Sequence, residues 1–139
     1  MKLLRIGDLG KEKPVALDSN EKYRDLSSII KDLDSENLNL KTLSKLQGLD
    51  LSSLPEISKK ERIGSCISKP GKFIAIGLNY SDHAAETGAK VPTEPIIFMK
   101  ATSSICGPYD NIEIVQGSKK LDWEVELGVI IGKDAKNIS

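Results

Sequence analysis

DWEVELGVIIG, residues 122–132, is the stretch that most constrains the fold of this 139-residue chain. Apolar and acidic side chains alternate in its first half, as in a strand whose successive side chains point to opposite faces. Glu124 and Glu126 would then share one face, about 7 Å apart. Residues 129–131 are apolar at every position, which indicates burial on both faces. The pattern predicts a β-strand over residues 123–131.

The two glutamates of this strand are candidate metal ligands. Two carboxylates at that spacing repel each other unless a positive charge lies between them, and Mg²⁺ prefers oxygen ligands of this kind. A strand with one side in water shows the same alternation, so the pattern alone leaves both interpretations open. The fully apolar end of the strand favours the metal site, because a strand buried at one end is less expected to be simply solvated at the other.

The sequence as a whole divides into two parts that differ in composition and pattern. Residues 56–71 are polar, and from residue 72 short β-type runs are separated by Gly and Pro. We therefore expect a small N-terminal domain over residues 1–68 and a β-rich domain over residues 69–139. The strands expected in the second part cover residues 73–76, 96–99, 112–115 and 123–131.

The first part is expected to be a small α+β unit. Short apolar stretches predict strands over residues 3–6 and 15–17, followed by a turn at Asp18-Ser19-Asn20. Leu26, Ile29, Ile30 and Leu33 follow the spacing of one helix face, with Asp25 placed to cap it, so we expect a helix over residues 26–33. A second, weaker helix pattern covers residues 38–46.

Composition and charge exclude several classes of protein. The chain has 20 Lys plus Arg and 20 Asp plus Glu, and this balance argues against binding to nucleic acid or to an anionic membrane. No apolar run reaches about 18 residues, so no membrane span is expected. Cys66 and Cys106 do not form a secreted disulfide pattern, and we interpret both as reduced thiols in a cytoplasmic protein.

A second candidate site lies in GLNYSDHAAE, residues 77–86, which follows an apolar strand and resembles a strand-to-helix turn. His83 is the only histidine, and with helical spacing the Glu86 carboxylate could accept a hydrogen bond from its ring. Such a pair makes a general base of His, although a surface His beside a chance acid is an alternative. Lys100 ends the apolar run PIIFMK and could contact an anionic substrate, or simply be solvated.

Taken in order, these segments resemble the opening of the catalytic domain of the fumarylacetoacetate hydrolase family. The matching pieces are GLNYSDHAAE, PIIFMK, GPYDNIEI and GSKKLDWEVELGVIIGK. The start, MKLLRIGDLGKEKPVALD followed by YRDLSSII, resembles the small N-terminal domain of bacterial members of the ureidoglycolate lyase or 2,4-diketo-3-deoxy sugar acid hydrolase type. One departure is Val115-Gln116 before Gly117, where a proline is common in relatives.

The resemblance implies a role for each matching residue. Glu124 and Glu126 match the glutamates that bind Mg²⁺ or Mn²⁺, and His83 and Glu86 match a dyad that activates water. It implies a mixed β-sheet roll, a 2-keto or 2,4-diketo acid substrate whose C–C bond is hydrolysed, and a homodimer for the full-length form.

The resemblance also implies that this chain is only the N-terminal half of such an enzyme. The family's third metal ligand is an aspartate about thirty residues beyond the Glu-x-Glu strand, and Asp134 lies too close to match it. We therefore expect the isolated chain to be poorly active. Three hypotheses stay open: a C–C hydrolase of keto acids, a ureidoglycolate lyase that breaks a C–N bond, and a truncated, non-catalytic chain that acts by association.

Overall fold

The structure is a computed structural model that describes residues 1–138. It contains two compact units, and each is described here by itself. The first unit comprises Met1–Ser68 together with the chain from Cys106 onward, and the second is Lys69–Ile105. Both units are small and mix antiparallel strands with few helices, as expected for an α+β protein. The domain division expected at residue 68 stays a prediction.

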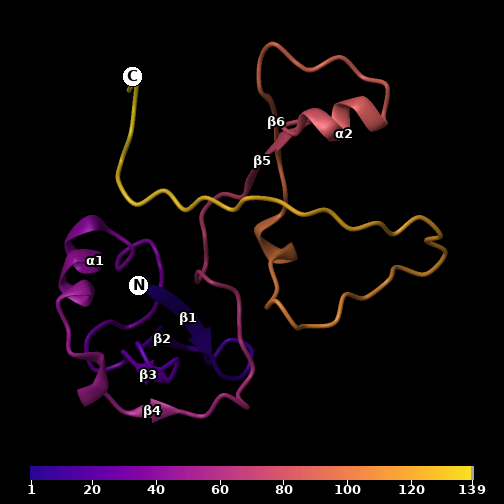
Figure 1. Ribbon diagram of the computed structural model, residues 1–139. Helices are drawn as coiled ribbons and strands as arrows, with labels where there is room; N and C mark the ends of the chain where they lie inside the picture. Colours follow the sequence, from indigo (N-terminus) through magenta and orange to yellow (C-terminus); the bar gives the residue numbers. More distant parts are fainter. Residues whose placement is uncertain (139) are drawn as a thin grey trace. The chain divides into compact units, whose positions relative to one another are not determined.

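Four short strands form an antiparallel sheet in the first unit (Figure 1). They are β1 (Lys2–Ile6), β2 (Lys13–Leu17), β3 (Tyr23–Asp25) and β4 (Glu56–Ile57), and they lie in the sheet in chain order. The strands expected over residues 3–6 and 15–17 are confirmed. β3 and β4 were not expected, because runs of three and two residues are too short to show an alternating pattern.

Asp18 holds the turn between β2 and β3. Its carboxylate accepts hydrogen bonds from the backbone N–H groups of Asn20, at 2.8 Å, and Lys22, at 2.9 Å. Its second oxygen accepts from Nε of Arg24 at 2.8 Å. The Lys22 hydrogen bond is the largest cause of a pKa lowered below the ordinary value of this carboxyl. The chain reversal expected at residues 18–20 is confirmed.

The helix expected over residues 26–33 is wrong, because only a single turn forms and the Leu33 N–H donates to the Asp32 carboxylate at 2.8 Å instead of to the Ile29 carbonyl. Asp25, expected as the helix cap, is instead the last residue of β3. The Leu26 N–H donates to the Pro14 carbonyl at 2.9 Å, which continues the strand pairing by one residue. The Asp25 carboxylate accepts from the Ser27 N–H at 2.8 Å, which starts a turn.

The apolar residues of this segment are nevertheless buried, as their spacing indicated. Leu26, Ile30 and Leu33 are at most 6% exposed. A single turn, closed by the Ile30 N–H and the Leu26 carbonyl at 3.0 Å, brings two of them to the same side. The Leu33 carbonyl accepts from the Ser68 N–H at 2.7 Å instead of continuing a helix. Helical spacing therefore identified the core residues but not the backbone that carries them.

The helix α1 (Leu40–Gln47) corresponds to the weaker helix pattern at residues 38–46. Asn39 caps it, and its side-chain oxygen accepts from the Thr42 N–H at 3.0 Å. Gly48 ends the helix, and the 3-10 turn η1 (Leu51–Ser53) follows. The cap explains why the helix begins two residues later than the apolar pattern.

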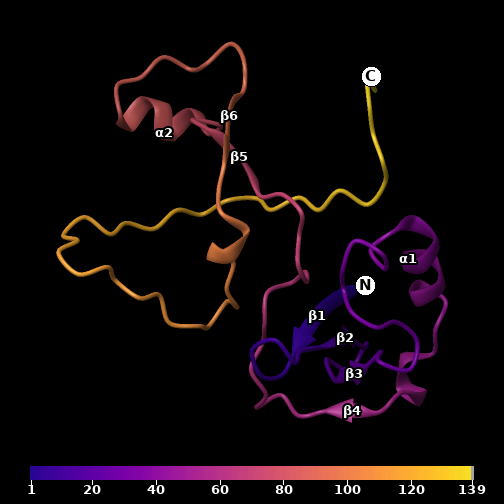
Figure 2. The same ribbon diagram turned by 180° about the vertical axis from the view of Figure 1, so that it is seen from behind.

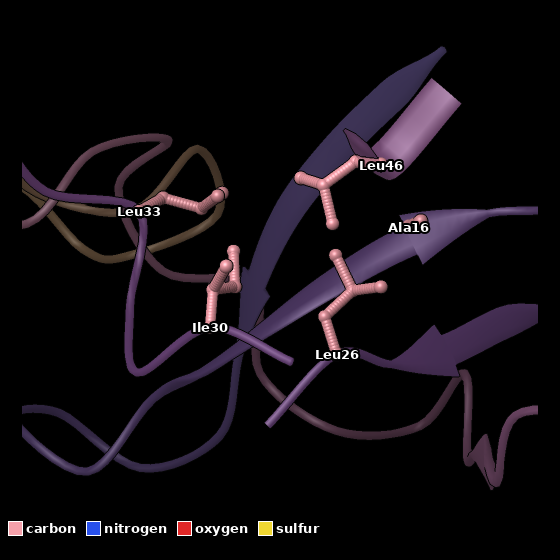
Figure 3. Packing of buried hydrophobic residues seen from close by; sticks show 5 residues of the cluster. All are labelled: Ala16, Leu26, Ile30, Leu33 and Leu46. Atoms are coloured by element: carbon pink, nitrogen blue, oxygen red, sulfur yellow. The ribbon is translucent and has the colours of Figure 1, made fainter. Parts of the chain in front are cut away.

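The core of the first unit lies between α1, the sheet and the irregular segment after β3 (Figure 3). In Figure 3, Leu46 of α1 points toward Leu26, and Ile30 lies beside them. Ala16 of β2 and Leu33 belong to the same buried cluster. Partly buried side chains complete it: Leu3, Ile29, Leu38, Leu49, Leu51 and Leu54.

The second unit consists of a two-stranded antiparallel sheet and one short helix. The strands are β5 (Ile74–Gly77) and β6 (Ile96–Met99), which confirms two of the four strands expected beyond residue 72. The helix α2 (Ser81–Glu86) follows β5, and a long loop leads from it back to β6 (Figure 2). The 3-10 turn η2 (Thr102–Ser104) comes after β6.

The strands expected over residues 112–115 and 123–131 are wrong for the described chain, since residues 111–138 contain no strand. Figures 1 and 2 show this stretch as coil. The side chains along both segments are exposed. A strand exists only where a neighbouring strand satisfies its backbone groups, and an alternating sequence does not supply that neighbour.

Candidate active site

α2 carries the expected catalytic pair in the second unit. The chain turns sharply from β5 into α2 at Leu78, whose φ of 49° is left-handed and unfavourable for a residue with a Cβ atom. His83 and Glu86 lie three residues apart on α2, so they occupy neighbouring positions on the helix surface. Both side chains are exposed, and the structure records no hydrogen bond between these two described residues. Their catalytic roles stay predictions.

A shallow hollow adjoins this strand-to-helix turn within the second unit. Its walls come from the end of β5 and from the loop that precedes β6. Apolar side chains predominate, while Asn79, Thr93 and Glu94 contribute polar groups. The lining residues are Ile76, Gly77, Leu78, Asn79, Val91, Pro92, Thr93, Glu94 and Pro95.

Lys100 follows β6 directly. Its backbone N–H donates to the Phe73 carbonyl at 2.9 Å, which extends the pairing of β5 and β6 by one step. The side chain is half-buried. Whether it contacts a substrate stays a prediction.

Glu124 and Glu126, the expected metal ligands, lie in the coil of the first unit. Both are exposed. Within residues 1–138 the structure gathers no group of three or more His, Cys, Asp or Glu side chains that could hold a metal ion. Two carboxylates separated by one residue suit a hard divalent cation in their donor chemistry, and water or substrate oxygens would complete its shell. The residues present therefore fit part of such a site.

Five charged side chains of the first unit form a connected polar cluster that the sequence did not reveal. Glu12 lies between two guanidinium groups: its Oε2 accepts from Nη2 of Arg5 at 3.2 Å, and its Oε1 accepts from Nη1 of Arg62 at 2.9 Å. Arg5 also binds Asp32, and Arg62 binds Asp110. The partners are up to 50 residues apart in the chain, so no short motif could have predicted this arrangement.

The electrostatics of this cluster follow from its geometry. Burial raises the pKa of Glu12, but hydrogen bonds from its own backbone and from Arg62, with the charge of Arg5, lower it below the usual 4.5. The pKa of Asp110 is lowered from 3.8, chiefly by its hydrogen bond from Arg62. The same contacts raise the pKa of Arg62. All three groups are therefore charged at neutral pH and hold one another in place.

The cluster also fixes the start of the GPYDNIEI segment within the first unit. Gly107 N–H donates to Oδ2 of Asp110 at 2.7 Å, and Gly107 packs against the Ile63 backbone, where a Cβ atom would clash with the Ile63 carbonyl oxygen. Ile63 itself forms an antiparallel bridge with Ile6 at the end of β1. The segment that precedes the two glutamates is thus anchored to the N-terminal sheet.

The sequence also led us to expect reduced cysteines and no membrane span. Cys66 and Cys106 are both exposed and free of a disulfide bond. Among the helices of residues 1–138, none is both long and apolar enough to cross a membrane.

The comparison with known proteins supports the resemblance that these sequence segments indicated. The family model described as fumarylacetoacetate (FAA) hydrolase C-terminal matches residues 72–139. Proteins named "Putative hydrolase" from Burkholderia ambifaria, Burkholderia multivorans and Burkholderia cenocepacia are each 54% identical to this chain over 138 residues. The match covers 99% of this chain and 49% of each relative, so the chain spans about half the length of the curated relatives it matches. Residues 72–139, which contain both glutamates and the His83–Glu86 pair, are therefore similar to the fumarylacetoacetate hydrolase family.

Proposed function

We propose that this chain forms part of a metal-dependent hydrolase that cleaves a C–C bond in a 2-keto or 2,4-diketo acid. One observation carries the proposal: the family match over residues 72–139 includes all four residues that could perform this chemistry. Glu124 and Glu126 would hold Mg²⁺ or Mn²⁺, and His83 with Glu86 would activate water. The hydrolase names of the Burkholderia relatives support the reaction class.

The two candidate sites would perform different parts of the reaction. A bound divalent cation would polarise the keto group of the substrate and neutralise its carboxylate. The His83 imidazole would accept a proton from the attacking water, and the Glu86 carboxylate would hold the ring and stabilise the imidazolium that forms. Lys100, at the end of β6, would add a positive charge near the acid groups of the substrate. We place this reaction in a mixed β-sheet roll, in a cytoplasmic protein that is a homodimer when full-length.

The metal assignment is tested with Mn²⁺ alone as the probe. Titration followed by electron paramagnetic resonance should show binding to the wild-type chain and at least a tenfold weaker affinity in the double variant Glu124→Gln/Glu126→Gln. Glu113→Gln removes another exposed carboxylate of the same coil segment and serves as the matched control. Equal affinity of the double variant and the wild type would remove the metal site from the proposal.

The reaction is tested by comparing acylpyruvates with ureidoglycolate, using the chain mixed with the half of a Burkholderia relative that it does not match. Mg²⁺-dependent loss of acylpyruvate, abolished by His83→Ala, supports the hydrolase. Release of glyoxylate from ureidoglycolate identifies the lyase of the same fold instead. Turnover of neither substrate class by the mixture would leave the non-catalytic chain as the surviving hypothesis.

A further inference from the structure

We propose that Cys66 and Cys106 are a redox-sensitive pair, which forms a reversible disulfide bond when the protein meets a peroxide. This modification does not depend on the proposed hydrolysis. Both cysteines are exposed and free of a disulfide bond. Each also lies beside a point where the chain passes between the two compact units, since the first passage follows Ser68 and the second precedes Cys106.

The two segments that carry the cysteines are in contact within the first unit. Gly107, which follows Cys106, packs so closely against the Ile63 backbone that a Cβ atom would clash with the carbonyl oxygen. Asp110 binds Arg62 through both of its carboxylate oxygens. The start of the later segment is therefore fixed against the chain just before Cys66.

The order of these contacts indicates on which side the two thiols lie. From Gly107 to Asp110 the later segment advances by three residues, while its partner in the earlier segment moves back by one residue. The two segments therefore run in opposite directions. The course of the earlier segment toward Cys66 leads to the end of the later segment that carries Cys106.

The backbone around Cys66 is bent and hydrogen-bonded. The Gly64 N–H donates to the Arg5 carbonyl at 2.8 Å, which keeps this part of the chain on the sheet. The Ser65 hydroxyl donates to the Ile67 carbonyl at 2.8 Å, across Cys66. The chain therefore bends at Cys66 instead of extending away from the contact. Such proximity is needed, because the Cα atoms of a disulfide lie about 4.4–6.8 Å apart.

Hydrogen peroxide is the oxidant that this step requires. The thiolate of one cysteine attacks a peroxide oxygen and the O–O bond breaks, which gives a sulfenic acid and a hydroxide that takes up the proton of that thiol. The other thiol attacks the sulfenic sulfur, the S–S bond forms, and the sulfenic oxygen leaves as water. In total the two thiols lose two hydrogen atoms and the peroxide becomes two molecules of water. A thiol reductant reverses the bond by exchange.

The disulfide would enclose the second unit in a covalent loop. Everything from Lys69 to Ile105 lies between the two cysteines in the chain. A cross-link of this kind stabilises a fold mainly by restricting the unfolded chain. Oxidation would therefore reinforce, by a covalent bond, the attachment that Arg62 and Asp110 make by charge.

The experiment treats the full, reduced chain with hydrogen peroxide in the absence of metal and substrate. Intact-mass spectrometry should show a monomer that has lost two hydrogen atoms, and peptide mapping should find Cys66 joined to Cys106. Dithiothreitol should restore the original mass, and the oxidised chain should unfold at a higher urea concentration than the reduced one. Dimers linked between chains, or oxidation of each cysteine to a sulfinic acid without a disulfide, would overturn the proposal.

Two comparisons show whether the fold positions the thiols. The bond should form at least tenfold faster in the native chain than in the chain unfolded in urea, and equal rates would contradict the proposal even if a variant failed to fold. Asp110→Ala releases the later segment from Arg62 and should slow the bond severalfold at pH 7. Asp8→Ala, at an exposed carboxylate of the same unit, should leave the rate unchanged. Because neither metal nor substrate is present, failure here is distinct from failure of the proposed reaction.

Discussion

Arg62 holds Asp110 through two parallel hydrogen bonds, Nε to Oδ1 at 2.7 Å and Nη2 to Oδ2 at 2.5 Å, across 48 residues of chain. Paired contacts of a guanidinium with a carboxylate are both stronger and more directional than single ones. Arg62 also donates to Glu12 and to the Gly7 carbonyl, so the same side chain binds the N-terminal sheet. One residue therefore connects that sheet to the family-matched segment.

The Arg62–Asp110 pair should make the first unit sensitive to acid. Because the pKa of Asp110 is lowered below 3.8, the pair stabilises the fold above that pH, and this stabilisation is lost as the pH falls through the lowered value. Asp110→Asn should therefore reduce stability at pH 7 and flatten its dependence on pH below about 4. Urea unfolding followed by circular dichroism between pH 7 and pH 3 measures both effects. Asp8→Asn, at an exposed carboxylate, is the control, and an equally steep acid dependence in Asp110→Asn would contradict the prediction.

Gly107 should tolerate no side chain. A Cβ atom there would collide with the Ile63 carbonyl oxygen and lie 2.9 Å from Oδ2 of Asp110. Gly107→Ala should cost about 1–3 kcal/mol in the free energy of unfolding, as overpacking usually does. Gly128→Ala meets nothing within 4 Å and should change it by less than about 0.5 kcal/mol. Similar values for the two variants would show that the contact with Ile63 does not stabilise the fold.

Arg5 should be essential for folding of the first unit. It is 6% exposed and lies between Glu12 and Asp32, and it also donates to the Ser65 hydroxyl. Arg5→Ala leaves two largely buried carboxylates without their main partner, which should cost about 3 kcal/mol or more. Urea unfolding gives the value.

The exposed pair of Lys22 and Glu56 provides the comparison for Arg5. Lys22→Ala should leave the unfolding transition nearly unchanged, because exposed ion pairs contribute little. If Lys22→Ala lowered the free energy of unfolding as much as Arg5→Ala, burial would not set the strength of these contacts.

Glu21 offers a stabilising substitution. Its φ of 58° places it in the left-handed region, within the turn between β2 and β3 that Asp18 holds. Glycine adopts this conformation without the penalty of roughly 1 kcal/mol that other residues incur. Glu21→Gly should raise the free energy of unfolding by at most about 0.5 kcal/mol, because the larger entropy of glycine in the unfolded chain offsets much of the gain. Ser19 lies in the same turn but has no left-handed φ, so Ser19→Gly should lower the free energy of unfolding. A more stable Ser19→Gly variant would contradict the argument.

The strands that the sequence predicted correctly include β1 and β2, which are close together in the chain. β1 pairs with β2 across a short connection, so the apolar runs and the intervening turn residues suffice to predict both. The segment after β3 shows where such patterns fail. Its apolar spacing identified Leu26, Ile30 and Leu33 as buried, but a helical period alone does not reveal that the Leu33 N–H is taken by the Asp32 carboxylate.

The sequence by itself determined the family resemblance, the candidate residues and the buried positions that follow β3, because these depend on residue type and local spacing. Tertiary structure alone decided which charges meet, as in the series from Asp32 through Arg5, Glu12 and Arg62 to Asp110. It also decided that the alternating run around Glu124 and Glu126 is coil within the described residues. The physical reason is common to both: an ion pair or a strand is made by two partners, and a sequence pattern describes only one of them.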